Sequence, residues 1–114
     1  MSKTILDGVR VLDFGRYIAG PYCAALLADL GADVIRVERR GGGEDRWVGP
    51  VAADGVGALY LTMNRNKRAM TLDPACPEGR EIVRKLVATA DVVVANLPPD
   101  VLRSLALDLD SLRR

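Results

Sequence analysis

Residues 10–38 read RVLDFGRYIAGPYCAALLADLGADVIRVE, in which two β-favouring runs, residues 10–14 and 33–38, flank one helix-favouring run. Short runs rich in Val, Ile and Leu are typical of strands that are buried on both faces of a sheet. Gly20 suits the N-cap of the helix, Pro21 its first turn and Gly31 a left-handed C-cap. We expect the helix to face the sheet with the apolar residues that recur at helical spacing, namely Cys23, Leu26, Leu27 and Leu30.

The same alternation continues downstream. Residues 69–73 (AMTLD) and 91–96 (DVVVAN) are two further β-favouring runs, and Pro77 opens a helix-favouring segment between them. One apolar stripe of this segment consists of Ile82, Val83, Leu86, Val87 and Ala90. Strands that alternate with helices form right-handed βαβ units and a parallel sheet. The predicted fold class is therefore α/β, a Rossmann-like and mostly parallel sheet with flanking helices.

Two segments lie outside this pattern. Residues 39–57 hold six of the eleven glycines and predict an ordered loop or a flexible lid. Residues 98–114 contain two short helical candidates, 101–105 and 109–112, and no further strand. We expect residues 1–114 to form one domain.

Composition limits the class of protein. With 114 residues, 49% hydrophobic and 27% charged, the chain has the size and composition of one globular domain. The net charge of +1 argues against a nucleic-acid or anionic-membrane partner. The longest apolar stretches fall short of the ~20 residues that a membrane span needs, and the opening residues lack the apolar core of a signal peptide. We expect a cytoplasmic protein.

The sequence contains no histidine. This excludes the commonest general base, every Ser-His or Cys-His nucleophile pair and the usual zinc ligands from its chemistry. Cys23 and Cys76 lie far apart and have no metal-ligand spacing, so we expect two reduced structural cysteines and no metal site.

In an open parallel sheet, ligands bind beyond the carboxyl ends of the strands. The first expected strand leads into a helix N-terminus, which favours an anion. The second leads through Arg39 and Arg40 into the glycines at 41–43, while the third and fourth end near residues 72–73 and 96–98. Glycines allow close backbone approach and arginines supply charge, which predicts a phosphorylated, adenine-type ligand. The G-x-G-x-x-G and P-loop signatures are absent, which disfavours NAD binding and triphosphate hydrolysis.

Several charged residues allow more than one interpretation. Residues 64–68 (NRNKR) form either a solvated loop that keeps a strand entrance polar or a phosphate-binding cluster. Asp13 stands inside an expected buried strand, so it needs a partner, such as an Arg or a backbone N–H of the following turn. We expect Glu44 and Asp45 to be solvated.

Two aromatic residues flank the glycine-rich segment. Trp47 and Tyr60 either pack this segment on the body of the protein or cover a ligand. The packing interpretation is the simpler of the two.

Residues 8–46 and 61–108 together carry the motifs VLDF, AGPYCA, LGADVIRVE, NRNKR and ADVVVAN. This set resembles the N-terminus of the family III CoA transferases of the CaiB/BaiF type, which include formyl-CoA transferase, carnitine CoA-transferase and α-methylacyl-CoA racemase. The similarity runs from about Leu6 to the end of the sequence. It implies a Rossmann-type domain in interlocked homodimers, with a CoA thioester (coenzyme A or acyl-CoA) as substrate and no tightly bound cofactor.

Carried over position by position, the resemblance implies a set of CoA-contacting residues. Ile18, Ala19 and Arg39 would meet the nucleotide. The adenine side would be lined by Leu72, Asp73, Pro74 and Ala75. The pantetheine path would follow Asn96, Leu97 and Pro98, with Ser104 near a further contact.

Chains of this family are several times longer, and their catalytic Asp lies beyond position 114, so the resemblance assigns no catalytic residue here. It implies the CoA-binding N-terminal part of an enzyme that moves CoA between carboxylic acids, inactive alone. An α-methylacyl-CoA racemase-type portion, a non-catalytic truncated interaction module, and an activity completed by a second polypeptide are the alternatives.

Overall fold

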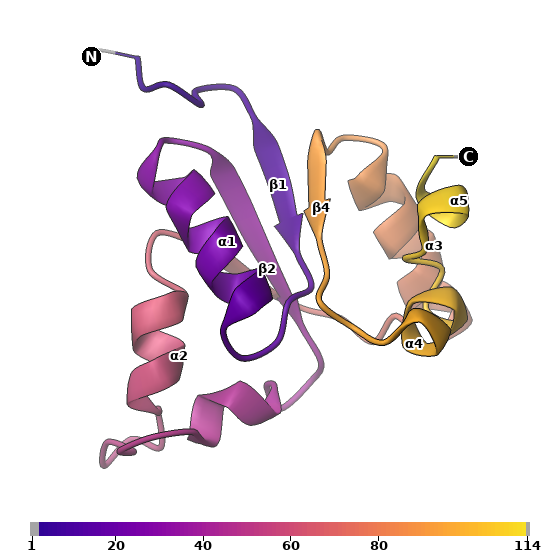
Figure 1. Ribbon diagram of the computed structural model, residues 1–114. Coiled ribbons are helices and arrows are strands. Elements are labelled where there is room, and N and C mark those ends of the chain that lie inside the picture. The colour runs from indigo at the N-terminus through magenta and orange to yellow at the C-terminus, as the bar shows by residue number, and fades with distance from the viewer. Residues whose placement is uncertain (1–2, 114) are drawn as a thin grey trace.

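The computed structural model describes residues 3–113 and confirms the α/β class (Figure 1). Within these residues, β1 (Arg10–Asp13), β2 (Asp33–Glu38), β3 (Arg68–Thr71) and β4 (Val92–Val94) form one sheet in the order β3-β2-β1-β4. Each neighbouring pair is parallel. The carboxyl ends of the strands therefore share one edge of the sheet.

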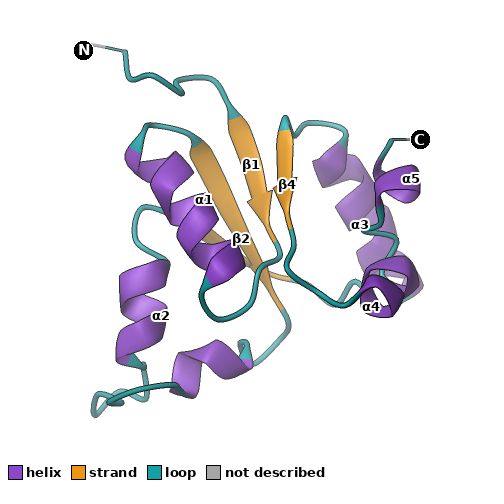
Figure 2. Ribbon diagram, in the orientation of Figure 1, coloured by secondary structure: helices purple, strands orange, loops and turns teal. Residues whose placement is uncertain are grey.

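Helices cover both faces of this sheet, which explains the nearly continuous apolar runs in β1 and β2. One face carries α1 (Ala19–Asp29) and α2 (Ala58–Met63) (Figure 2). The other carries α3 (Pro77–Val87), α4 (Pro99–Ser104) and α5 (Leu109–Leu112). None of the helices in residues 3–113 is long and apolar enough to cross a membrane.

Side chains of β1 and β2 alternate between these two layers. Leu12 and Ile35 join the core on the α3 side, whereas Val11 and Val34 join the core under α1. The α1 face is apolar at the start of the strands and becomes charged toward their carboxyl ends, because the following same-face positions are Asp13, Arg36 and Glu38.

The helix α1 contacts the sheet through small residues. Its buried positions are Gly20, Pro21, Ala24, Ala25 and Ala28. The expected leucine-rich contact face is therefore wrong: Leu27 packs against the core, but Cys23 is exposed, and Leu26 and Leu30 are 43% and 44% exposed. Alanine allows the helix axis to approach the strands closely, so the larger side chains lie on the outer face.

The ends of α1 also differ in part from the expectation. The N-cap is Ile18 rather than Gly20, which lies inside the first turn. Gly20 is needed there because a Cβ atom would lie 2.5 Å from Asn96 Oδ1. Gly31, just after the C-cap Leu30, has a φ of +102° and confirms the left-handed stop.

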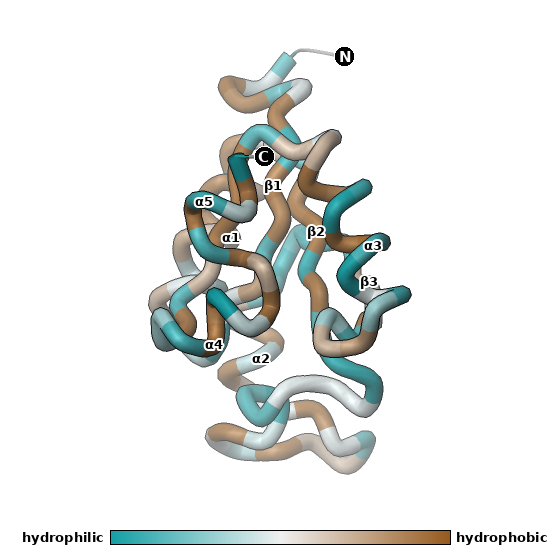
Figure 3. Tube along the Cα trace, turned by 90° about the vertical axis from the view of Figure 1, so that its right-hand side faces the viewer, coloured by the Kyte–Doolittle hydropathy of each residue, from teal (hydrophilic) through white to brown (hydrophobic). Residues whose placement is uncertain are grey.

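The remaining predicted strands and helices lie where the sequence places them, but their bounds differ by a few residues. β3 ends at Thr71, and the ladder closes with a hydrogen bond from Leu72 N to Glu38 O. The helix α3 shows polar and apolar segments in turn (Figure 3), although Ile82 of its expected apolar stripe is exposed. The short helix α2 was not expected. The glycine-rich segment is ordered around one 3₁₀ turn, η1 (Glu44–Trp47).

Candidate functional site

The carboxyl ends of the strands surround a small hollow of about 30 Å³. Four of the residues predicted for the site line it: Arg39, Leu72, Pro74 and Leu97. The other lining residues are Phe14, Arg16, Val37, Glu38, Leu105 and Leu107. The hollow thus has apolar walls from both ends of the chain and two arginines from the ends of β1 and β2.

Ile18 and Ala19 are exposed at the N-terminus of α1. The carbonyl of Ile18 accepts the hydrogen bond of Tyr22 N at 2.7 Å, so the first turn is closed. Pro21 follows with no N–H of its own, which leaves the first-turn N–H groups to come from Ala19 and Gly20. These groups and the helix dipole favour an anion at this point.

Asp73 and Ala75 form the turn that leads into α3. Asp73 Oδ1 accepts from Ala75 N at 2.9 Å, and the Asp73 carbonyl accepts from the thiol of Cys76 at 3.2 Å. Cys76 is the N-cap of α3, and its Sγ accepts from Gly79 N. The side chain of Asp73 therefore shapes the turn beside the hollow.

Pro98 and Ser104 stand at the two ends of α4 and do not line the hollow. Pro98 is the N-cap, and its carbonyl accepts from Leu102 N. Ser104 Oγ donates to Val101 O at 2.8 Å, and the carbonyl of Ser104 accepts from Arg80. Ser104 thus does not line the hollow, although the next residue, Leu105, does.

Asn96 binds the β1–α1 turn with both atoms of its side-chain amide. Asn96 Oδ1 accepts from Arg16 N at 2.6 Å, and Asn96 Nδ2 donates to Arg16 O at 2.9 Å. The next residue, Tyr17, has a left-handed φ of 60°, which L residues rarely adopt. Asn96 thus holds a tight turn at the mouth of the hollow.

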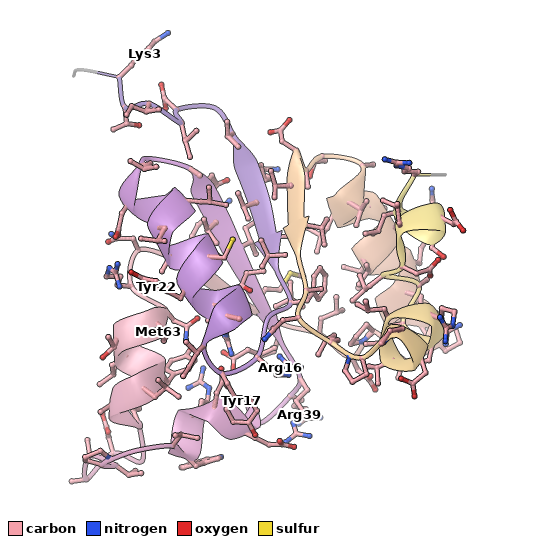
Figure 4. All side chains as sticks on the ribbon, viewed as in Figure 1. Lys3, Arg16, Tyr17, Tyr22, Arg39 and Met63 are labelled. Atoms are coloured by element: carbon pink, nitrogen blue, oxygen red, sulfur yellow. The ribbon has the colours of Figure 1, made fainter. Side chains whose placement is uncertain are left out.

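Arg39 lines the hollow from the end of β2, and Figure 4 labels it together with Arg16 and Tyr17. Arg39 Nε donates to Gly42 O at 3.0 Å, and its guanidinium lies 3.7 Å from Glu44 Oε1. Tyr17 Oη donates to Glu44 Oε2 at 3.0 Å. This hydrogen bond and the charge of Glu44 raise the pKa of Tyr17 above its usual value.

Asp13, the carboxylate inside β1, has the turn N–H partner that the sequence predicted, since Oδ1 accepts from Gly15 N at 2.8 Å. Its second oxygen accepts from Lys67 Nζ at 2.7 Å. Lys67 also donates to Pro21 O and to Asn64 Oδ1, both at 2.8 Å. Burial lowers the pKa of Lys67 in spite of the neighbouring carboxylate.

The cations of residues 64–68 are all committed to ion pairs within the fold. Lys67 is buried against Asp13, so neither a solvated loop nor a phosphate site describes it. The exposed Arg65 and Arg68 lie 2.6 Å and 2.7 Å from Asp29 and Asp33. This segment fastens the entrance of β3 to α1 and β2.

Arg36 lies at the centre of a buried charged cluster beneath η1 and α2. Its guanidinium lies 2.6 Å from Asp45 Oδ2 and donates to Asn64 Oδ1 at 2.9 Å. The expectation that Asp45 is solvated is wrong, because its side chain is 1% exposed, whereas Glu44 is exposed as expected. The glycine-rich segment turns back over the sheet and carries Asp45 to the one buried guanidinium on β2.

Glu38 fixes the other end of the same segment. Its carboxylate accepts from Gly43 N at 3.0 Å, from Arg46 Nε and Nη2 at 2.8 and 2.7 Å, and from Tyr60 Oη at 3.0 Å. Burial alone would raise the pKa of Glu38, but these hydrogen bonds outweigh it and hold the pKa at about 2. Arg46 stacks over the Tyr60 ring at 4.1 Å, so Tyr60 packs the segment on the body, while Trp47 is exposed.

Sequence reasoning missed that Arg16 lines the hollow and that Lys67 and Asp45 form buried ion pairs. One signal for the buried cluster was present: Arg36 and Glu38 are ionisable residues at alternate positions of a strand that reads as buried. Within residues 3–113, no group of three or more His, Cys, Asp or Glu side chains is placed to hold a metal ion.

Comparison with known proteins points to one family. The model of CoA-transferase family III matches residues 6–114. The succinate–glutarate CoA-transferase of Agrobacterium fabrum is 46% identical over 97% of this chain, and a formyl-CoA:oxalate CoA-transferase of Rhodopseudomonas palustris is 50% identical over 90% of it. The chain spans 30% and 24% of the lengths of these two relatives.

Solved structures agree with this result. A CAIB/BAIF family protein from Brucella suis matches 98% of the chain with a TM-score of 0.89 and 43% identity, and the match covers 31% of that protein. A short chain dehydrogenase/reductase family protein matches with a TM-score of 0.51 at 16% identity, which reflects the fold alone.

Proposed function

Because this chain belongs to CoA-transferase family III, we propose that it forms the part of such an enzyme that binds the CoA thioester substrate. In this proposal, the longer protein transfers CoA from one carboxylic acid to another. The names of the two relatives, a succinate–glutarate and a formyl-CoA:oxalate CoA-transferase, support a reaction of this class. We assign no residue of this chain to the covalent step.

The main support for this proposal is the lining of the hollow at the carboxyl edge of the sheet. It combines the guanidinium of Arg39 with apolar walls from Leu72, Pro74 and Leu97. The chemistry of CoA matches this lining. Its nucleotide end carries phosphates and an adenine ring, and its pantetheine arm is uncharged. A guanidinium suits the phosphates, and apolar side chains suit the ring.

The N-terminus of α1 follows the turn of Arg16, which lines the hollow, and would supply the second element of an anion site. Ile18 and Ala19 are exposed there, and the free N–H groups of a first helical turn attract phosphate oxygens. We therefore propose that the nucleotide phosphates lie between this turn and Arg39. The turn of Asp73 and Ala75 would then border the adenine, and Leu97 and Pro98 the start of the pantetheine arm.

Asn96 and Ser104 take other parts in this proposal. The Asn96 amide is occupied by the main chain of Arg16, so Asn96 would act on the ligand through the turn. Ser104 Oγ bonds to Val101 O within α4 and Ser104 does not line the hollow, so we leave it out of the proposed contacts.

Calorimetric titration of the chain with CoA tests the proposal. We expect saturable binding that weakens at higher salt, because the contacts are ionic. Arg39→Ala should weaken binding by about 1–3 kcal/mol through the loss of a charged hydrogen bond. Arg84→Ala is the matched control, since Arg84 is an exposed arginine of α3 that pairs with Glu81 outside the hollow. A folded sample that shows no binding at millimolar CoA would contradict the proposal.

A further inference from the structure

Arg16 lines the same hollow as Arg39 but reaches it from another strand end. It follows β1, whereas Arg39 follows β2, so the two side chains start from neighbouring strand ends (Figure 4). Of the charged side chains that line the hollow, Glu38 is already paired with Arg46, whereas the two arginines attract anions. Their arrangement indicates a place for a negatively charged group.

The charge of Arg16 is not neutralised by the fold. Within residues 3–113, no carboxylate lies within 4.0 Å of its guanidinium, and its side chain donates one long hydrogen bond, at 3.4 Å, to Gly15 O. Arg39 differs, because Glu44 lies beside it. Of the two arginines in the hollow, Arg16 is thus the one whose positive charge is fully available to a ligand.

The main chain of Arg16 is fixed more firmly than that of an ordinary surface loop. Asn96 binds both its N–H and its carbonyl, at 2.6 Å and 2.9 Å. Gly20 packs closely against the same amide, and a Cβ atom at this position would lie 2.5 Å from Asn96 Oδ1. The side chain of Arg16 therefore starts from a defined position, which reduces the entropy lost when it binds a ligand.

We propose that Arg16 is a second phosphate-binding residue of the site and that Asn96 is its positioning residue. This inference rests on the proposed function above. A phosphate or diphosphate group would lie between the guanidinium groups of Arg16 and Arg39, each of which can donate two parallel hydrogen bonds to phosphate oxygens.

Other cations near the site do not fit this role. The cations at 65, 67 and 68 are paired with Asp29, Asp13 and Asp33. Arg40 is exposed and does not line the hollow. Arg46 is held by Glu38 and Tyr60.

The experiment compares CoA binding by the chain and its Arg16→Gln, Arg16→Lys and Asn96→Ala variants, after circular dichroism has shown that each is folded. We expect Arg16→Gln to weaken binding about tenfold, as for the loss of a charged hydrogen bond, and to reduce its salt dependence. Arg16→Lys should retain part of the affinity, because lysine keeps the positive charge but lacks the paired N–H donors of a guanidinium group. Arg84→Gln, the matched control, should bind as the parent chain does.

Asn96→Ala tests the positioning role. If Asn96 acts through Arg16, its removal weakens binding in the parent chain but has little further effect in Arg16→Gln, so the two changes are not additive. A merely structural role for Asn96 would weaken binding equally in both backgrounds and would overturn this part of the inference.

The two proposals fail in different ways. If the parent chain does not bind CoA, the proposed function is wrong. If the parent chain binds CoA and Arg16→Gln binds equally well with the same salt dependence, the function stands and the role of Arg16 is wrong.

Discussion

Lys67 Nζ lies 2.7 Å from Asp13 Oδ2, and the two side chains are 2% and 0% exposed. This pair joins the residue before β3 to the last residue of β1, and the same ammonium group binds the carbonyl of Pro21 in the first turn of α1. The strand end, the helix N-terminus and the entrance of β3 are thus held by one buried cation. The edge of the sheet that carries the candidate site depends on this contact.

Removing the cation should destabilise the protein strongly. Lys67→Met leaves the buried carboxylate of Asp13 without its charged partner, for which we expect a loss of about 3–5 kcal/mol in urea unfolding. Arg68→Gln is the control, because it breaks an exposed pair with Asp33 and should cost less than about 1 kcal/mol. Equal losses in the two variants would show that Lys67 is not part of a buried pair.

Glu38 should make stability depend on pH in the acid range. Its pKa is about 2 in the folded chain and 4.5 as the reference value, so its contribution is complete above about pH 4.5 and is lost as the pH falls toward 2. At about 1.4 kcal/mol per pH unit, the contribution is about 3 kcal/mol. Glu38→Gln should lower stability at neutral pH and flatten the curve between pH 4.5 and 2. The exposed Glu81→Gln is the control, and an unchanged slope in Glu38→Gln would contradict the assignment.

The Tyr17–Glu44 hydrogen bond can be detected by titration of the phenol. Because Glu44 raises the pKa of Tyr17, Glu44→Gln should bring the pKa down toward 10. Ultraviolet absorbance of the phenolate follows this change, and Tyr17→Phe identifies the transition among the three tyrosines. Asp54→Asn removes another loop charge as a control. A Tyr17 transition that stays in place in Glu44→Gln would mean that the bond is absent in solution.

The alanine face of α1 should tolerate added volume poorly. Ala24→Leu inserts a larger side chain between α1 and the sheet, where Ala24 is fully buried, and should destabilise the protein by about 1–3 kcal/mol or more. Leu26→Ala removes a partly exposed side chain and should cost about 0.5–1 kcal/mol. Thermal or urea unfolding of the two variants measures both effects. The opposite ranking would place Leu26, rather than Ala24, against the sheet.

Secondary structure and fold class were largely predictable, because they depend on short-range patterns. The bounds of β2 match the predicted run, and Gly31 ends α1 as its conformational freedom predicts. The orientation of α1 was not predictable from its apolar residues, because alanine and leucine both count as apolar. The distance between the helix and the strands decides which of them fits.

The candidate site was predictable in outline. The rule that ligands bind at the carboxyl ends of parallel strands selected Arg39, Leu72 and Leu97, which the structure gathers around one hollow. Arg16 directly follows the first predicted strand, but nothing in the sequence distinguishes it from Arg40, which follows the second. The difference between the two arginines lies in their tertiary contacts, because Asn96, 80 residues away in the sequence, binds the main chain of Arg16.

By itself, the sequence determined the succession of strands and helices, the parallel sheet and the edge at which a ligand would bind, since each of these follows from local periodicity and from the stops at glycine and proline. Only the tertiary structure decided which charges are available there. Lys67, Asp45 and Glu38 are neutralised inside the fold, whereas Arg16 has no ion-pair partner among residues 3–113. The reason is physical: a charge is neutralised by whichever group lies within a few ångströms, and those groups come from distant parts of the chain.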